Sequence, residues 1–399
     1  MTSRKKVYLK GFLAIFACAF AAFYLFQSFL FYGTSGSKIT RSKKPRKIRK
    51  LTGLFRETDI SACDARAVFN KKNARRLLEL SFDTLTLWPE RFPASFSPAE
   101  ILERGKDPGL NINLLHKKNI TGKGVSIAVI DQRIFTGHKE YKDRLEVYGE
   151  FHYFRLERFL KRKGHGEGMV SVIAGKTCGI APGSKIYYLA TDPGTLSVFS
   201  SSYYSYDLKY LALAVERILR ESGDISAVVF ASVWPDKKLK GYEYLLKTLQ
   251  KVSQKGIFIA SPLSDYYGYR IGALTRNPLS DPNRFSSYSP FKLFAGLGGE
   301  KGEKVIFVPG DSRTVASPYG ENEYAFLRHS KYSVAVSYMA GLWALCKQAK
   351  PDLSPREFMK EAYGSSRRIK FSGREIRIVN PVKLVSRFEK KGGRNENIQ

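Results

Sequence analysis

Short apolar runs alternate with longer amphipathic segments through residues 123–380, and this alternation constrains the fold more than any other feature. Five runs have the length and composition of buried strands: 125–130, 185–190, 226–232, 257–261 and 304–308. Between them, apolar residues recur at helical spacing in 208–219 and 245–252. Such alternation predicts an α/β fold with a doubly wound, mainly parallel sheet and helices on both faces.

Three polar residues stand at the predicted ends of such elements. Asp131 directly follows the strand 125–130, His165 lies between two glycines at the start of a small-residue helical run, and Ser333 opens a predicted helix over 333–348. Taken alone, Asp131 is explained as a helix or turn cap, and Ser333 as a small residue that eases helix packing. A serine nucleophile, however, needs a base and a group that orients the base, and Asp, His, Ser is one of the known chain orders. We therefore expect the three side chains to converge.

The segments around these residues resemble the subtilisin-like serine proteases over about 115–385. The matching motifs are 122–131 around Asp131, 165–175 followed by 179–183 around His165, and 331–345 followed by 351–355 around Ser333. The resemblance implies a serine endopeptidase that forms an acyl-enzyme on Ser333, with His165 as base and Asp131 orienting it. It also implies a peptide or protein substrate, and we expect neither a cofactor nor a metal.

Several positions depart from the family pattern. Lys331-Tyr332-Ser333-Val334-Ala335 replaces Gly-Thr-Ser-Met-Ala, and Asp265 stands where the family has its oxyanion-binding Asn. Trp234 stands where a Gly lines the substrate cleft. The substrate-binding residues that the resemblance implies are Ser232, Val233, Trp234, Pro262 and Leu263. These departures leave open an alternative, a noncatalytic subtilase-like pseudoprotease that binds or regulates a peptide or protease partner.

The oxyanion position is the departure with the clearest chemical meaning. The first amides of a helix are unpaired donors, so the N–H of Ser333 can help to hold an oxyanion. The second donor is usually an Asn side chain. Asp265 can donate only when it is protonated, and an ionised carboxylate would repel the developing negative charge.

The amino-terminal region has the pattern of a membrane anchor. Residues 11–32 hold no charged residue and are long enough to cross a bilayer. We predict a single-pass transmembrane helix; the alternative is a cleaved signal peptide, because 19–21 form an Ala-x-Ala site. The positive charges of 38–50 outnumber those before the span and favour a cytoplasmic position for the domain after the span. The resemblance implies export, and we expect an extracytoplasmic catalytic domain.

Net charge narrows the choice of partners. The chain carries 67 Lys and Arg against 36 Asp and Glu, a formal charge of +31. This positive charge favours binding to anionic lipid or to a cell-wall polymer. Beside the peptidase and the pseudoprotease, a third hypothesis for the function is an adhesion module that binds anionic polymers. No nucleic-acid-binding motif accompanies the charge, so we expect no specific nucleic acid partner.

Composition shifts divide the chain into five segments. Residues 1–32 form the anchor or signal segment, 33–50 a polybasic linker, and 51–115 an N-terminal extension or pro-segment with a helical stretch over 73–82. Residues 116–385 form the peptidase domain, and 386–399 are expected to be a disordered basic tail. Two interpretations of the extension remain open: an inhibitory, fold-assisting pro-segment that is removed, or a permanent extension packed on the core.

Overall fold

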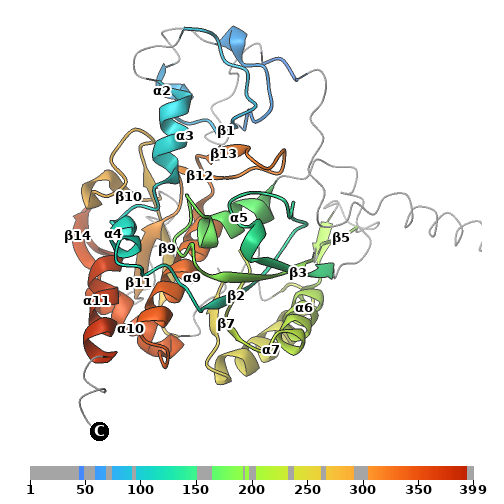
Figure 1. Ribbon diagram of the computed structural model, residues 1–399, viewed down its shortest axis with the longest axis vertical. Coiled ribbons are helices and arrows are strands. Elements are labelled where there is room, and N and C mark those ends of the chain that lie inside the picture. Colours follow the sequence, from blue (N-terminus) through green and yellow to red (C-terminus); the bar gives the residue numbers. More distant parts are fainter. Residues whose placement is uncertain are drawn as a thin grey trace, which may run out of the picture.

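The centre of the protein is a five-stranded parallel sheet in the order β3-β4-β2-β7-β8 (Figure 1). The computed structural model describes residues 45–48, 59–68, 74–91, 96–150, 164–191, 194–196, 204–231, 238–261, 267–291 and 304–392. The strands are β2 (Ser126–Asp131), β3 (Leu145–Glu150), β4 (Lys185–Ala190), β7 (Ile225–Val229) and β8 (Phe258–Ala260). Because β4 and β7 flank β2 on opposite sides, the carboxyl end of β2 is a switch point in strand order, where open α/β sheets bind ligands.

Helices cover both faces of this sheet, as the sequence predicts. Successive strand residues point to opposite faces. Accordingly, Ile127 and Val129 belong to one buried cluster, whereas Ala128 and Ile130 belong to another. The first cluster contains α5 (His165–Ala174) and α9 (Lys331–Ala349), and the second contains α6 (Leu208–Glu221) and α7 (Tyr242–Gln254). The expected doubly wound α/β architecture is therefore confirmed for the central sheet.

A second sheet is formed by strands that follow β8 in the chain, and it contains the last of the five predicted strands, 304–308. Its order is β10-β9-β11-β15-β14, and β9 and β11 run parallel. The strands are β9 (Arg270–Arg276), β10 (Tyr288–Pro290), β11 (Val305–Pro309), β14 (Arg367–Phe371) and β15 (Arg374–Ile378). The run 304–308 is thus a strand, but the structure assigns it to this second sheet.

The carboxyl-terminal region corrects one expectation. The helices α10 (Pro355–Ser365) and α11 (Pro381–Gly392) follow α9 in the chain, and α11 contacts α9. The tail predicted to be disordered from 386 is therefore helical as far as Gly392. Its apolar side chains explain this, because Leu384, Val385 and Phe388 share one helical face and are fully buried.

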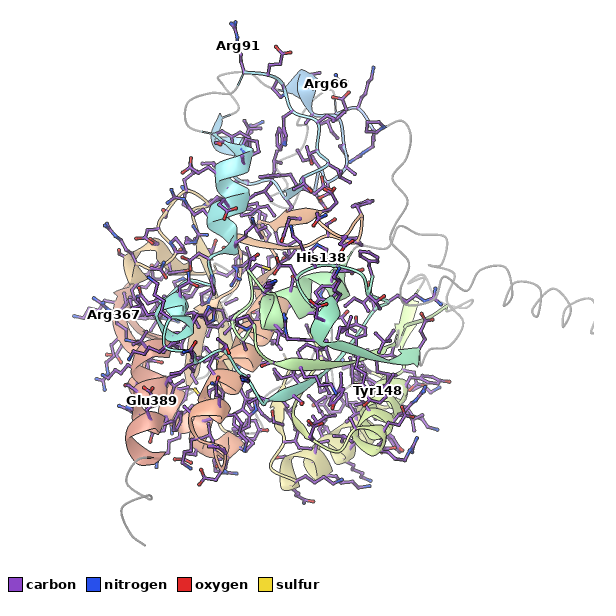
Figure 2. All side chains as sticks on the ribbon, in the orientation of Figure 1. Arg66, Arg91, His138, Tyr148, Arg367 and Glu389 are labelled. Carbon is purple, nitrogen blue, oxygen red and sulfur yellow. The ribbon has the colours of Figure 1, made fainter. Side chains whose placement is uncertain are left out.

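The N-terminal extension packs on the following domain through a small three-stranded sheet to which both contribute (Figure 1). The strand β1 (Phe82–Asp83) pairs antiparallel with β13 (Tyr324–Leu327), which pairs with β12 (Arg313–Ala316). The aromatic rings of Phe82, Trp88, Phe96 and Phe326 pack together there. Arg66 and Arg91 lie at the outer end of the extension, and Glu389 of α11 lies toward the other end of the molecule (Figure 2).

The predicted helix over 73–82 is much shorter in the structure. It is α2 (Ala74–Leu77), because Phe82 and Asp83 pair with β13, and the Asp83 carboxylate accepts hydrogen bonds from the amides of Ala62 and Leu85. The other helical elements of the extension and its junction are η1 (Arg66–Val68), α3 (Pro98–Lys106) and α4 (Ile112–His116).

The remaining elements are short. They are η3 (Lys142–Arg144), the hairpin of β5 (Gly194–Leu196) and β6 (Tyr204–Tyr206), and η5 (Phe285–Ser287). Among the residues that the structure describes, no helix has the length and apolarity needed to cross a bilayer. The proposed span, 11–32, lies outside those residues.

Candidate active site

Asp131 is the last residue of β2, at the switch point of the sheet, and its side chain is fully buried. Its Oδ1 accepts a hydrogen bond of 2.7 Å from the amide of Gln132. Both carboxylate oxygens lie 2.8 Å from Nδ1 of His165. A buried carboxylate held in this way fixes the imidazole with its Nδ1 proton facing Asp131 and leaves Nε2 for the nucleophile.

Two glycines allow His165 to take its place at the start of α5. Gly164 has a φ of +71°, and a Cβ there would lie 2.6 Å from Cδ of Pro318. A Cβ on Gly166 would lie 2.2 Å from the hydroxyl of Tyr188, which donates to the carbonyl of Gln132 beside Asp131. The Gly-His-Gly sequence therefore reflects close packing around the base as well as the turn into the helix.

Ser333 lies in the first turn of α9, which begins two residues earlier than predicted. Its Oγ is 3.1 Å from Nε2 of His165 and 2.9 Å from the carbonyl of Ala231, just beyond β7. The hydroxyl has one proton and therefore donates to only one of these acceptors at a time. The amide of Ser333 is among the first four of the helix, which have no partner in the preceding turn.

The surroundings of His165 alter its affinity for protons. Burial by itself lowers the pKa of His165, but the charge of Asp131, its hydrogen bond and the charge of Glu167 together raise it above its ordinary value. The protonated imidazole is thus stabilised in the resting site. In that form Nε2 donates to Ser333, whose hydroxyl donates to Ala231.

Sequence reasoning missed two participants, Glu167 and Ala231. Glu167 is fully buried, and its Oε1 accepts a 2.8 Å hydrogen bond from the amide of Phe135. A single charged residue in the run 166–174, which is otherwise made of small and apolar residues, was the available signal for Glu167. Ala231 contributes only a backbone carbonyl, and its side chain carries no signal.

The other predicted site residues lie outside the part of the chain that the structure describes. These are the oxyanion candidate and the five substrate-binding candidates: Asp265, Ser232, Val233, Trp234, Pro262 and Leu263. Their roles remain predictions. Within the described ranges, no three His, Cys, Asp or Glu side chains gather as metal ligands.

Comparisons with known proteins find similarity only among solved structures. No protein-family profile matches this sequence, and no curated protein matches it either. One similar solved structure is the prenylagaramide maturation protease PagA, with 14% identity, a TM-score of 0.49, and coverage of 70% of this chain and 98% of that one. A cold-adapted subtilisin-like serine proteinase has 18% identity and a TM-score of 0.45, covering 65% and 89%. The subtilase cytotoxin SubAB has 16% identity and a TM-score of 0.49, covering 73% and 97%.

The fold assignment rests on the chain's own geometry. Its motifs place Asp131 at the end of a central parallel strand and His165 and Ser333 at the starts of two helices on one face of that sheet. The described part of the chain thus has a subtilisin-like α/β fold, and hydrogen bonds join its Asp131, His165 and Ser333 in the arrangement of a Ser-His-Asp triad.

Proposed function

We propose that this protein is a membrane-tethered serine endopeptidase. The observation that carries the proposal is the continuous set of hydrogen bonds from Asp131 through His165 to Ser333, at 2.8 Å and 3.1 Å. Because these residues come from three separate elements, their alignment is characteristic of a nucleophile activated by a base.

The reaction follows from this geometry. Neutral His165 accepts the Oγ proton of Ser333 on Nε2 while Oγ forms a bond to the carbonyl carbon of the substrate. The carboxylate of Asp131 accepts the hydrogen bond from Nδ1 and stabilises the imidazolium. As the C–N bond breaks, Nε2 returns the proton to the leaving amine. Water, deprotonated by His165, then hydrolyses the ester, and Ser333 regains its proton.

The test is covalent labelling of Ser333 by a fluorophosphonate, with detergent present to keep the full chain soluble. We expect wild type to be labelled, Ser333→Ala to be unlabelled, and Asp131→Asn to react at least ~100-fold more slowly, because the wrong imidazole tautomer cannot act as base. A folded wild-type protein that resists labelling would contradict the proposal.

One observation favours the second candidate, a noncatalytic pseudoprotease. Ser333 lies closer to the carbonyl of Ala231 than to His165, 2.9 Å against 3.1 Å, so its proton has a competing acceptor. With Lys331 and Tyr332 in place of Gly and Thr, the cleft then serves as a peptide-binding site. Peptide binding that survives in Ser333→Ala, without labelling of wild type, would identify this function.

The membrane part of the proposal is supported by the sequence of 11–32 and by the basic segment 38–50. An apolar span holds the protein in the bilayer, and the basic segment binds anionic headgroups. We place the catalytic domain outside the cytoplasm, as the family resemblance implies. The protein should resist carbonate extraction of membranes, and deletion of 1–32 should release it. Recovery of a mature chain that begins near Ala22 would instead establish a cleaved signal peptide.

A further inference from the structure

A short segment of the N-terminal extension holds the chain just before the nucleophile. Residues 78–81, between α2 and β1, lie against Arg328 and His329, which follow β13. Arg328 donates from Nε to the carbonyl of Leu78 at 2.9 Å and from its backbone amide to Oγ of Ser81 at 3.0 Å. We name residues 78–81 the clamp segment.

Glu79 makes the ionic contacts of the clamp segment. Its Oε1 accepts from Nη2 of Arg328 at 3.1 Å, and its Oε2 lies 3.3 Å from Nε2 of His329. The hydrogen bond from His329, with help from Arg328, lowers the pKa of Glu79 to about 2. Glu79 therefore stays charged over the whole pH range in which a histidine titrates.

Arg328 joins the clamp segment to the interior of the peptidase core. Its Nη1 donates to Oδ2 of the buried Asp311 at 2.7 Å, and the side chain of Arg328 is only 8% exposed. One guanidinium thus binds the extension on one side and the segment between β11 and β12 on the other. Because a buried guanidinium needs all its partners, movement of the clamp segment would disturb the position of Arg328.

The clamped residues lead directly into the nucleophile through strained backbone. Lys331 has a φ of +49°, a left-handed conformation that is unusual for a side chain of this size. Such backbone persists only where its surroundings hold it. Lys331 lies two residues after His329 and two before Ser333, so the clamp segment fixes one end of this strained turn.

We propose that the clamp segment positions Ser333 and that the N-terminal extension is accordingly a permanent, activating part of the enzyme. Glu79 and Ser81 act through Arg328 and His329 and are positioning residues, since neither contacts the triad in the structure. This inference rests on the proposed function. It gives the extension the opposite role to a removable inhibitory pro-segment.

The test compares two matched double variants of the full chain in detergent. Glu79→Gln with Ser81→Ala removes the charge that Glu79 presents to Arg328 and His329 and the hydroxyl that accepts from the amide of Arg328, and it leaves Arg328 with Asp311. The control, Glu103→Gln with Ser97→Ala, makes the same substitutions in the same extension, where Glu103 pairs with Lys106 and Ser97 caps α3. Two quantities are measured: the rate at which a fluorophosphonate labels Ser333, and amide hydrogen exchange over 328–335.

We expect the clamp variant to label about tenfold more slowly than wild type, because small displacements of a nucleophile cost large factors in rate. Its exchange over 328–335 should be faster, whereas the control should match wild type in both respects, although loss of the Ser97 cap also lowers its stability. Equal labelling of the two variants, or a slow control, would overturn the inference. If wild type itself is not labelled, the proposed function fails. Hydrogen exchange over 328–335 then tests the clamp segment by itself, and unchanged protection in the clamp variant refutes its positioning role.

Discussion

The single proton of the Ser333 hydroxyl decides the resting state of the site, because both His165 and Ala231 compete for it. With His165 protonated, Ser333 donates to Ala231 and accepts from His165, and no base is available. Loss of the His165 proton frees Nε2 to accept. On the proposed function, rising pH therefore makes His165 available as the base.

The sign of this pH dependence follows from the raised pKa of His165. We expect the labelling rate to rise with pH to a plateau, with a midpoint above 6.5, the ordinary value for histidine. Glu167→Gln removes one of the charges that raise this pKa and keeps an acceptor for the amide of Phe135, so its midpoint should lie lower. The measurement is the labelling rate against pH, with Glu103→Gln as control. A midpoint at or below 6.5 in wild type would contradict the argument.

The departure at Asp265 gives a second prediction at this scale. If its side chain faces the oxyanion, Asp265→Asn supplies a neutral donor and should raise turnover at neutral pH by about tenfold or more, since one donor is typically worth a few kcal/mol. Peptidase turnover in the two proteins measures this. Equal turnover would show that another group completes the oxyanion site.

At the scale of elements, the sequence predicts what has a regular local pattern. The strand β2 is apolar throughout its middle, and α6 repeats its apolar residues at helical spacing, so both are predictable from local periodicity. The strand β3 is half-exposed at the sheet edge and has no such pattern. The pairing of β1 with β13 joins two residues to a strand far along the chain, and no local signal announces it.

Local sequence patterns also decide which residues of the site can be predicted. Asp131, His165 and Ser333 each follow or begin a regular element in a recognisable motif, so the sequence predicts them. The contact of Glu79 with Arg328 spans 249 positions and depends on the packed arrangement of the extension. Tertiary contacts of this kind have no signature in a single sequence.

The start of α5 yields a stability prediction. Gly164→Ala introduces a Cβ at a φ of +71° and 2.6 Å from Pro318, whereas Gly256→Ala introduces one at +73° with open space around it. Gly256→Ala should cost about 1 kcal/mol from backbone strain. Gly164→Ala should cost about 1–3 kcal/mol more, because the packed neighbour must also move. Denaturant unfolding of both variants measures the difference, and equal losses would show that Pro318 yields freely.

At the scale of the whole molecule, the extension shares its core with the peptidase domain. Phe326 of β13 packs in the same cluster as Phe82 and Phe96, and Tyr324 binds the hydroxyl of Thr84 through its amide. We therefore expect the form of the protein that reacts with the fluorophosphonate to retain the extension.

The fluorophosphonate-labelled protein can be isolated from membranes and its peptides identified by mass spectrometry. We expect the labelled species to contain residues 74–91, because removal of this region would expose Phe326 and unclamp Arg328. A labelled species that begins after residue 96 would support the pro-segment reading. Labelling after limited proteolysis of the extension, at an undiminished rate, would do the same.

The hydrogen bond between Arg328 and Leu78 also determines when this part of the fold can form during synthesis, since it joins residues 250 positions apart. During synthesis the clamp segment leaves the ribosome long before Arg328 and Ser333, so the proposed clamp can close only after residue 328 has been made. On the proposed function, a partly made chain carries no working nucleophile. A chain that stops before Arg328 then has neither the clamp contacts nor Ser333.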